Sequence, residues 1–253
     1  MIVGVIPARY ASSRLPGKPL ADICGKPMIQ HTYESAKKAK LLDHIVIATD
    51  DKRVLDVCES FGADVRLTPD DIKTGSDRIA YIAKRLQTAK IIVNIQGDEP
   101  FIPGKMIDQA IEPLLFDTSV KVSTLVKKID NLEDLKSDSI PKVVFDYQNY
   151  ALYFSRSPIP YVRDASSKNW LKEGEFYKHI GLYVYRKSAL MKFTSFEPTD
   201  LENTEKLEQL RMLENGMKIK VVTTEFESMS VDTKRDLELA REYYEDYILA
   251  KKK

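Results

Sequence analysis

The chain has 253 residues, of which 43% are hydrophobic and 30% are charged, the balance of an ordinary soluble globular protein. Its 39 basic and 38 acidic side chains nearly cancel, which argues against the basic excess that is typical of a nucleic-acid-binding surface. The two cysteines, Cys24 and Cys58, lack CxxC spacing and suggest neither a zinc site nor a disulfide framework. There is no apolar run of the ~18 residues that a membrane span needs, and no apolar stretch of a signal peptide at the N-terminus, so we expect a cytoplasmic protein.

Apolar, β-branched runs alternate with helical patterns through the first half of the chain. Strands are predicted at residues 2–6, 44–49, 64–67 and 90–96, with helices between them at 27–40, 51–61 and 75–86. A helix at 103–116 and a strand at 119–127 extend the pattern. This alternation predicts βαβ units with right-handed crossovers and a mainly parallel sheet.

The pattern changes after about residue 130. Residues 141–160 predict two strands around a turn at Gln148–Asn149, and residues 164–174 a loop. There follow a strand that leads into a short helix (179–190), an amphipathic helix at 204–215 with Gly216 as its cap, a strand at 218–224 and a closing helix at 233–250. We expect a single α/β domain over 1–253, with a half at about 1–130, an inserted hairpin-bearing lobe at about 131–230, and a closing segment at 231–253.

Three cations, Arg9, Arg14 and Lys18, lie directly after the first predicted strand, in the segment PARYASSRLPGKPL (7–20). In an open parallel sheet, ligands bind beyond the carboxyl ends of the strands, so this loop is a candidate binding site. Neither GxGxxG nor GxxxxGK[ST] is present. Fixed cationic side chains could therefore hold phosphate groups, which backbone amides hold in those motifs. A solvated basic loop is the alternative.

The segment QGDEP (96–100) follows the most apolar of the predicted strands. An acidic pair at a strand end is costly inside a fold unless it meets a cation. Mg²⁺ prefers carboxylate oxygens together with water and phosphate ligands, so Asp98 is a candidate metal ligand. A loop or capping carboxylate is the alternative. Glu99 is a weaker candidate, because neighbours in an extended stretch point to opposite sides.

Two other loops could contribute to the same site. In SVDTKRDLELA (230–240), Asp232 could supply a second carboxylate to a metal, although Asp232 or Thr233 also fits a helix N-cap. In TGSDRIA (74–80), a helix start offers backbone N–H groups and one cation, Arg78, and an ordinary capped helix fits equally well.

A less specific group lies in the second half of the chain. It consists of Arg156, His179 and the predicted helix at 204–215. Glu205 and Glu208 are three positions apart, so they would share a helix face with Gln209 nearby. A structural histidine and a solvated helix face are the default interpretations of this group.

Six motifs in order resemble sugar-acid cytidylyltransferases over residues 2 to about 241. They are IPARYASSRLPGKPL, VNIQGDEPFI, ALYFSRSPIP, HIGLYVYR, EKLEQLR and VDTKRDLELAR. The resemblance is closest to the members that act on 3-deoxy-manno-octulosonate (Kdo). It implies a nucleotide-diphospho-sugar transferase (Rossmann-like) fold, with a mainly parallel sheet in three layers and an inserted β-hairpin lobe, usually in a homodimer whose contacts lie in that lobe.

The resemblance also assigns roles to residues. The CTP-binding set would be Arg9, Ser12, Arg14, Lys18, Thr74, Ser76, Arg78, Gln96 and Asp98. The sugar acid would face Gln96, Arg156, His179, Tyr183, Glu205 and Gln209. Asp98 and Asp232 would bind Mg²⁺, and Lys18, Arg14, Asp98 and Asp232 would form the catalytic set. In this assignment 1–130 binds CTP, 131–230 binds the sugar and forms the dimer, and 231–253 carries the metal loop.

The implied reaction transfers CMP from CTP to Kdo, giving CMP-Kdo for lipopolysaccharide synthesis and pyrophosphate. The anomeric hydroxyl would attack the α-phosphorus, and Mg²⁺ and Lys18 would stabilise the charge that develops on the phosphate oxygens. Two alternatives stay open. One is a cytidylyltransferase for another sugar acid, such as sialic acid, and the other is a non-catalytic nucleotide-binding regulatory protein.

Overall fold

The computed structural model describes residues 1–12 and 14–249, and the chain separates into two compact units. Unit 1 comprises residues 1–108 with the described part of 227–253, and unit 2 comprises residues 109–226. Helix α4 (Gly104–Phe116) runs across the boundary. The predicted division of the chain into functional segments assigns roles to residues and stays a prediction. Among the described residues, no helix is long and apolar enough to cross a membrane.

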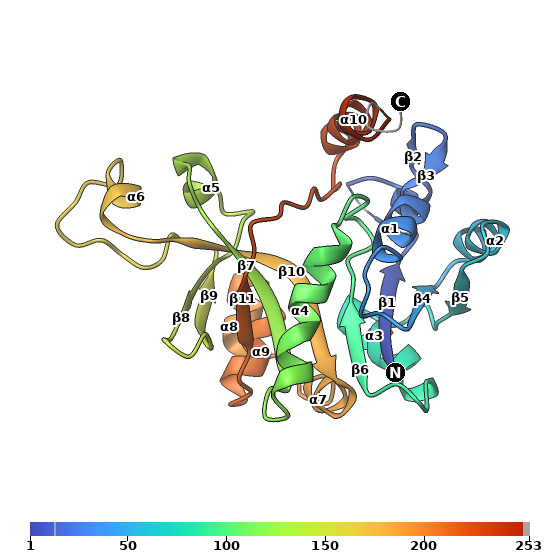
Figure 1. Cartoon of the computed structure of the whole chain (residues 1–253), viewed down its shortest axis with the longest axis horizontal. Coiled ribbons are helices and arrows are strands. Elements are labelled where there is room, and N and C mark those ends of the chain that lie inside the picture. The colour runs from blue at the N-terminus through green and yellow to red at the C-terminus, as the bar shows by residue number, and fades with distance from the viewer. Residues whose placement is uncertain (13, 250–253) are drawn as a thin grey trace. The chain divides into compact units, whose positions relative to one another are not determined.

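Unit 1 is built on four parallel strands in the order β6-β1-β4-β5 (Figure 1). The strands are β1 (Ile2–Ala8), β4 (His44–Thr49), β5 (Asp64–Leu67) and β6 (Ile91–Asn94). Val3, Val5, Ile47 and Ile92 are at most 1% exposed, because both faces of the sheet are covered. The four strands predicted in the first half are therefore confirmed, and so is their parallel arrangement.

Helices connect these strands. They are α1 (Met28–Ala36), α2 (Lys52–Ser60) and α3 (Gly75–Arg85). Unit 1 also contains α10 (Lys234–Tyr243), near the C-terminus. The N-cap side chains of α2 and α3, Asp51 and Thr74, accept hydrogen bonds from backbone N–H groups of the first turn. A short 3₁₀ turn (Lys18–Leu20) and a two-stranded ribbon of β2 (Asp22–Ile23) and β3 (Lys26–Pro27) lie between β1 and α1.

Unit 2 has a mixed sheet. Strand β10 (Tyr177–Arg186) runs antiparallel to β7 (Val122–Lys128) and β8 (Lys142–Phe145), and β11 (Lys220–Thr223) lies parallel to β7. Strand β9 (Ala151–Ser155) pairs with β8 to form the predicted hairpin. The helices are α5 (Leu132–Lys136), α6 (Trp170–Glu173), α7 (Lys187–Phe193), α8 (Asp200–Glu205) and α9 (Gln209–Glu214).

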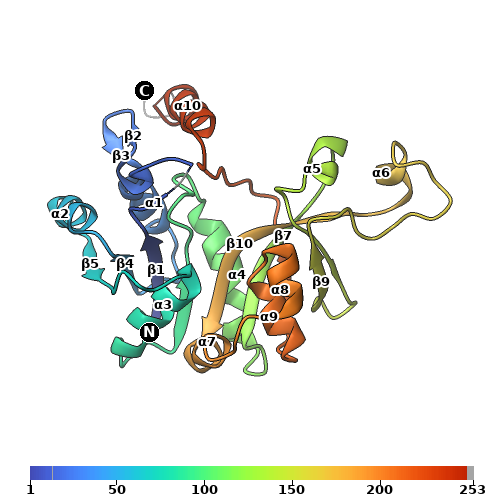
Figure 2. The ribbon, with the colours of Figure 1, turned by 180° about the vertical axis from the view of Figure 1, so that it is seen from behind.

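Three predictions for the second half need correction. The single helix at 204–215 is wrong, because Lys206 adopts φ 53° and separates α8 from α9 as two short helices, which Figure 2 shows from behind. The loop predicted at 164–174 contains the short helix α6. The closing α-helix ends at Tyr243 and continues as a π-helical stretch over Tyr244–Leu249, while Ala250 lies outside the described residues.

Arg156 provides the physical reason for the break at Lys206. Its Nε donates to the Glu205 carbonyl at 2.6 Å, and its Nη2 donates to the Lys206 carbonyl at 3.3 Å. A side chain therefore satisfies the carbonyls that helical N–H groups would bind in a continuous helix. The periodicity of the sequence does not show this interaction.

Candidate active site

The carboxyl edge of the unit 1 sheet brings together segments that are distant in the sequence. Ala8 at the end of β1 pairs with Thr49 at the end of β4, and Val5 pairs with Asn94 at the end of β6. The basic loop after β1, the Asp50–Asp51 segment after β4 and the QGDEP segment after β6 consequently leave the sheet at one edge. This edge is where ligands bind in open parallel sheets.

A cavity of about 550 Å³ lies at this edge, and all of its lining residues belong to unit 1. The lining residues are Pro7, Ala8, Arg9, Ala11, Ser12, Arg14, Lys18, Pro19, Met28, Ile72, Lys73, Thr74, Gly75, Arg78, Gln96, Gly97, Asp98 and Asp232. Every residue predicted to bind CTP is in this set except Ser76, which is buried in the first turn of α3.

Lys18 joins the two carboxylates that were predicted as metal ligands. Its Nζ donates to Asp98 Oδ2 at 2.6 Å and to Asp232 Oδ1 at 2.8 Å. Arg14 Nη2 lies 2.9 Å from the same oxygen of Asp232. Burial alone would lower the pKa of Lys18. The negative charges of the two carboxylates and their hydrogen bonds to the ammonium outweigh this effect and raise the pKa, so the ammonium stays charged at neutral pH.

The backbone holds this cluster in place from two directions. Gly17 has φ 68°, which a glycine adopts without strain, and caps the 3₁₀ turn that begins at Lys18. The Val231 N–H donates to the Asp98 carbonyl at 2.9 Å, which ties the second acidic loop to the first. Asp236 accepts hydrogen bonds from the N–H groups of Asp232 and Thr233 in a capping box at the start of α10. Thr233 is the N-cap, and Asp232 precedes it and faces the cavity.

The donor set suits a divalent cation that prefers oxygen ligands. Asp98 and Asp232 converge on the same Lys18 ammonium, so a cation in its place would meet two carboxylates. No group of three or more acidic, histidine or cysteine side chains placed to hold a metal occurs among the described residues. Two carboxylates fit an ion that takes its other ligands from phosphate and water.

Gly97 and Glu99 show how tightly the acidic segment packs. A Cβ at Gly97 would lie 2.5 Å from the Pro7 carbonyl oxygen, so only glycine allows this backbone to approach the end of β1. Glu99 is buried and is not a cavity-lining residue. Burial and the neighbouring Asp98 charge raise the pKa of Glu99 to about 8, so its side chain is mostly protonated at pH 7.

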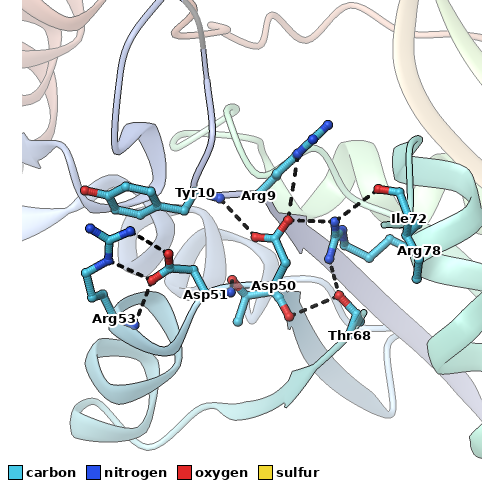
Figure 3. A network of polar contacts seen from close by, with 9 residues as sticks. Arg9, Tyr10, Asp50, Asp51, Arg53, Thr68, Ile72 and Arg78 are labelled. Carbon is cyan, nitrogen blue, oxygen red and sulfur yellow. Dashed lines mark hydrogen bonds and ion pairs between the residues drawn. The ribbon is translucent and has the colours of Figure 1, made fainter. Parts of the chain in front are cut away.

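Arg78 is nearly fully buried in the cavity wall, at 2% exposure. Its guanidinium donates to the hydroxyl of Thr68, to Asp50 Oδ2 at 2.9 Å and to the Ile72 carbonyl at 3.5 Å (Figure 3). Asp50 and Thr68 were not among the residues predicted from the sequence. Asp50 could have been found, because it comes directly after the strand predicted at 44–49, just as Arg9 and Asp98 come soon after the strands predicted at 2–6 and 90–96.

Three further residues of the predicted CTP-binding set also line the cavity, namely Arg9, Ser12 and Gln96. The Arg9 side chain is 52% exposed, and its Nε lies 3.8 Å from Asp50 Oδ2. Ser12 Oγ accepts the N–H of Leu15 at 3.4 Å, which bends the basic loop. The Gln96 side-chain amide donates to Asn94 Oδ1 at 3.4 Å.

In unit 2, the structure brings Arg156 and Glu205 together. The Arg156 N–H donates to Glu205 Oε2 at 3.0 Å, and the Ser155 hydroxyl donates to Oε1 at 2.7 Å. The Arg156 guanidinium donates to three carbonyl oxygens, those of Glu205, Lys206 and Asp138. These three acceptors are uncharged, so the guanidinium keeps its positive charge and can still attract an anion.

His179 and Tyr183 form a second pair in unit 2, with ring centroids 5.3 Å apart on one face of β10. The Thr124 hydroxyl lies 3.0 Å from His179 Nε2. Burial lowers the pKa of His179 to about 3 and raises that of Tyr183 well above its usual value. Both groups are therefore neutral hydrogen-bonding groups. Gln209 is buried, and its Nε2 has no hydrogen-bond partner among the described residues.

The unit 1 sheet, the basic loop that follows its first strand, and Asp98 with Asp232 define an α/β protein with a charged cavity at the carboxyl edge of its sheet, of a kind that suits a phosphorylated ligand. Comparison with known proteins identifies the kind of enzyme. The family model for cytidylyltransferases matches residues 3–219, and the chain belongs to this family.

Relatives over nearly the whole length agree with this assignment. The chain is 52% identical to 3-deoxy-manno-octulosonate cytidylyltransferase of Geobacter sulfurreducens over 244 residues, which is 94% of this chain and 96% of the relative. It is 53% identical to the enzyme of the same name from Pelobacter propionicus over 252 residues, 96% and 97% of the two chains.

A solved structure confirms the predicted fold class. The structure is that of CMP:2-keto-3-deoxy-manno-octonic acid synthetase complexed with CTP, to which this chain is similar with a TM-score of 0.90 and 37% identity. The match covers 100% of this chain and 99% of the other. The chain therefore has the nucleotide-diphospho-sugar transferase fold.

His179 gives a prediction that can be tested without substrate. Because its pKa is about 3 in the folded protein and 6.5 ordinarily, only the unfolded chain takes up this proton as the pH falls through that range. The contribution of His179 to the free energy of unfolding is therefore complete above about pH 6.5 and is lost as the pH falls towards 3. We expect the NMR resonance of His179 Hε1 to keep its neutral-imidazole shift down to about pH 5, whereas the urea-unfolded chain titrates near 6.5. A folded-state midpoint near 6.5 would contradict the lowered pKa of His179.

Proposed function

We propose that this enzyme transfers CMP from CTP to Kdo, forming CMP-Kdo and pyrophosphate, and so activates Kdo for lipopolysaccharide synthesis. The observation that carries this proposal is the convergence of Lys18, Asp98 and Asp232 at the edge of a cavity lined by Arg9, Arg14 and Arg78. The relatives named for Kdo, identical at about half of all positions over nearly the full length, support the choice of sugar.

The residues of unit 1 bind and orient the triphosphate in this proposal. In the reaction, the anomeric oxygen of Kdo forms a bond to the α-phosphorus, and the bond from that phosphorus to the leaving pyrophosphate oxygen breaks, while the hydroxyl loses its proton. Negative charge builds up on the phosphate oxygens. Lys18 and Arg14 are fixed cations that stabilise this charge without reorganisation during the step.

Asp98 and Asp232 would hold Mg²⁺ in this proposal. Their convergence on one ammonium group supports the assignment. When bound, Mg²⁺ supplies further positive charge to the phosphate oxygens. With the ion bound, Lys18 would share the two carboxylates with it, and N–H groups of Lys18 would then be able to donate to phosphate.

The unit 2 residues fit the recognition of a polyhydroxylated acid. Arg156 retains a positive charge that can attract the sugar carboxylate, and neutral His179, Tyr183 and Gln209 offer hydrogen bonds to hydroxyl groups. The unpartnered Nε2 of buried Gln209 is the strongest support for this part, because a buried polar group without a partner is costly until a ligand satisfies it.

The direct test of the proposed function is pyrophosphate release. The purified enzyme with CTP and Mg²⁺ should release pyrophosphate with Kdo, and much less with sialic acid or when another nucleoside triphosphate replaces CTP. Preference for another sugar acid would overturn the choice of Kdo. CTP binding by titration calorimetry without turnover on any sugar acid would instead favour a non-catalytic nucleotide-binding protein.

Replacing Lys18 tests the charge-stabilising cluster. We expect Lys18→Ala to lower kcat ~10²–10³-fold and to change the KM for Kdo far less, because the ammonium acts mainly on charge that develops in the transition state. Steady-state kinetics gives both quantities. Lys26→Ala is a matched control, since Lys26 is paired with Glu34 at 2.8 Å outside the cavity lining and should leave both unchanged. An unchanged kcat in Lys18→Ala would remove Lys18 from the catalytic set.

We also propose a homodimer formed through unit 2. Leu152 on β9 is 61% exposed. The Ala151 N–H at the start of β9 donates to the Ile219 carbonyl, and beyond Ala151 the strand pairs only with β8 among the described residues, so that part of its other edge lies open. An exposed edge with an apolar side chain is a natural site for pairing with another chain. Sedimentation equilibrium should give a dimer, and Leu152→Lys should shift it towards monomer. Leu239→Lys, at an exposed leucine of α10, should not. A monomeric unaltered enzyme would contradict this proposal.

A further inference from the structure

Asp50 stands between the basic loop and the buried arginine of the cavity wall. Its Oδ1 accepts the backbone N–H of Tyr10 at 3.3 Å, and its Oδ2 accepts from Arg78 Nη2 at 2.9 Å. Arg9 Nε lies 3.8 Å from the same Oδ2 (Figure 3). One carboxylate therefore contacts the first two residues after β1 and a residue of α3, which are far apart in the sequence.

Asp50 itself does not line the cavity, whereas Arg9 and Arg78 both do. Its side chain is only 11% exposed, and that of Arg78 is 2% exposed. The carboxylate is thus positioned behind the two guanidinium groups. It can act on a ligand only through the residues that it holds.

Thr68 and Thr49 complete the support. The Thr68 hydroxyl accepts from Arg78 and donates to the Thr49 carbonyl at 3.1 Å, at the end of β4. Asp50 is the next residue of the chain, and β4 is a central strand of the unit 1 sheet. The Arg78 guanidinium is therefore anchored to the end of β4 by two contacts, one through Thr68 and one through Asp50. Such an arrangement holds a cationic group in one orientation.

We propose that Asp50 is a positioning residue that sets the affinity of the enzyme for the triphosphate. It fixes Arg78 in the cavity wall and ties the start of the basic loop to the end of β4, so that Arg9 is held loosely and can turn to a phosphate oxygen. This inference rests on the proposed use of a nucleoside triphosphate and does not depend on which sugar acid is the acceptor.

Removing the charge of Asp50 has two opposing effects on the affinity for the triphosphate. Loss of a negative charge near an anion site would by itself strengthen triphosphate binding. The charge of Asp50 is, however, largely compensated by Arg78 at 2.9 Å, so this gain is small. Loss of the ion pair lets the buried Arg78 guanidinium and the start of the basic loop move. We expect this loss of preorganisation to outweigh the small electrostatic gain, so that the triphosphate binds more weakly.

The test compares CTP with cytidine, which has no phosphates, by titration in the presence of Mg²⁺. We expect Asp50→Asn to weaken CTP binding by about tenfold or more, the effect of losing one charge-assisted contact, and to leave cytidine binding nearly unchanged. If Asp50 had only a structural role, the variant would bind both CTP and cytidine more weakly. CTP binding as tight as in the unaltered enzyme, or an equal loss for cytidine, would overturn the proposal.

Asp51→Asn is the matched control. Asp51 is the neighbouring carboxylate, caps α2 and pairs with Arg53 at 2.6 Å, outside the cavity lining. It should leave CTP and cytidine binding as they are, even if the loss of the cap lowers the melting temperature. Weaker CTP binding in Asp51→Asn, matching that in Asp50→Asn, would contradict a specific role for Asp50.

Thr68→Val is the second variant and is decisive if Asp50→Asn does not fold. It removes the hydroxyl that supports Arg78 from the other side and keeps the charge pair, so CTP binding should weaken several-fold with cytidine unaffected. Unchanged CTP binding would overturn the proposal. Failure of the proposed function is distinguishable, since an enzyme that binds CTP but releases no pyrophosphate with Kdo would refute that function and leave these binding results valid.

Discussion

The cluster of Lys18 with Asp98 and Asp232 is the interaction on which the candidate site depends. Two carboxylates at 2.6 and 2.8 Å from one ammonium would repel each other without it. The cluster joins three loops whose positions in the sequence span the length of unit 1. Because the hydrogen bonds of the cluster fix these charges relative to one another, the site suits a cation and a polyphosphate with little reorganisation on binding.

The geometry of a parallel sheet explains why these loops meet. Strands β1, β4 and β6 run in the same direction and in fixed register, so the residues that follow them must leave at the same edge. The close approach of Gly97 to the Pro7 carbonyl and the bond from Val231 to Asp98 then fix the loops relative to one another. Backbone contacts thus determine which side chains share the cavity.

The sequence alone predicts those features of unit 1 that depend on the spacing of apolar residues and on the order of the strands. Alternating patterns identified the strands and helices of unit 1, and the position after each strand identified the basic loop and Asp98. What it could not predict depends on long-range contacts. The break at Lys206 arises from the bonds of Arg156 to two carbonyls, and the roles of Asp50 and Thr68 arise from their contact with Arg78. Patterns within a segment carry no information about such partners.

The candidate residues of the two units differ in their charge, and this difference matches the two kinds of ligand proposed for them. In unit 1 the cations face carboxylates, so they retain their charge and are neutralised only in part, as binding of a highly charged triphosphate requires. In the sugar site proposed for unit 2, burial keeps His179 and Tyr183 neutral, so they would recognise hydroxyl groups by hydrogen bonding, and Arg156 would supply the positive charge. A substrate with one carboxylate and several hydroxyls matches that balance better than a second phosphate ester would, because a phosphate ester would need more than one compensating cation.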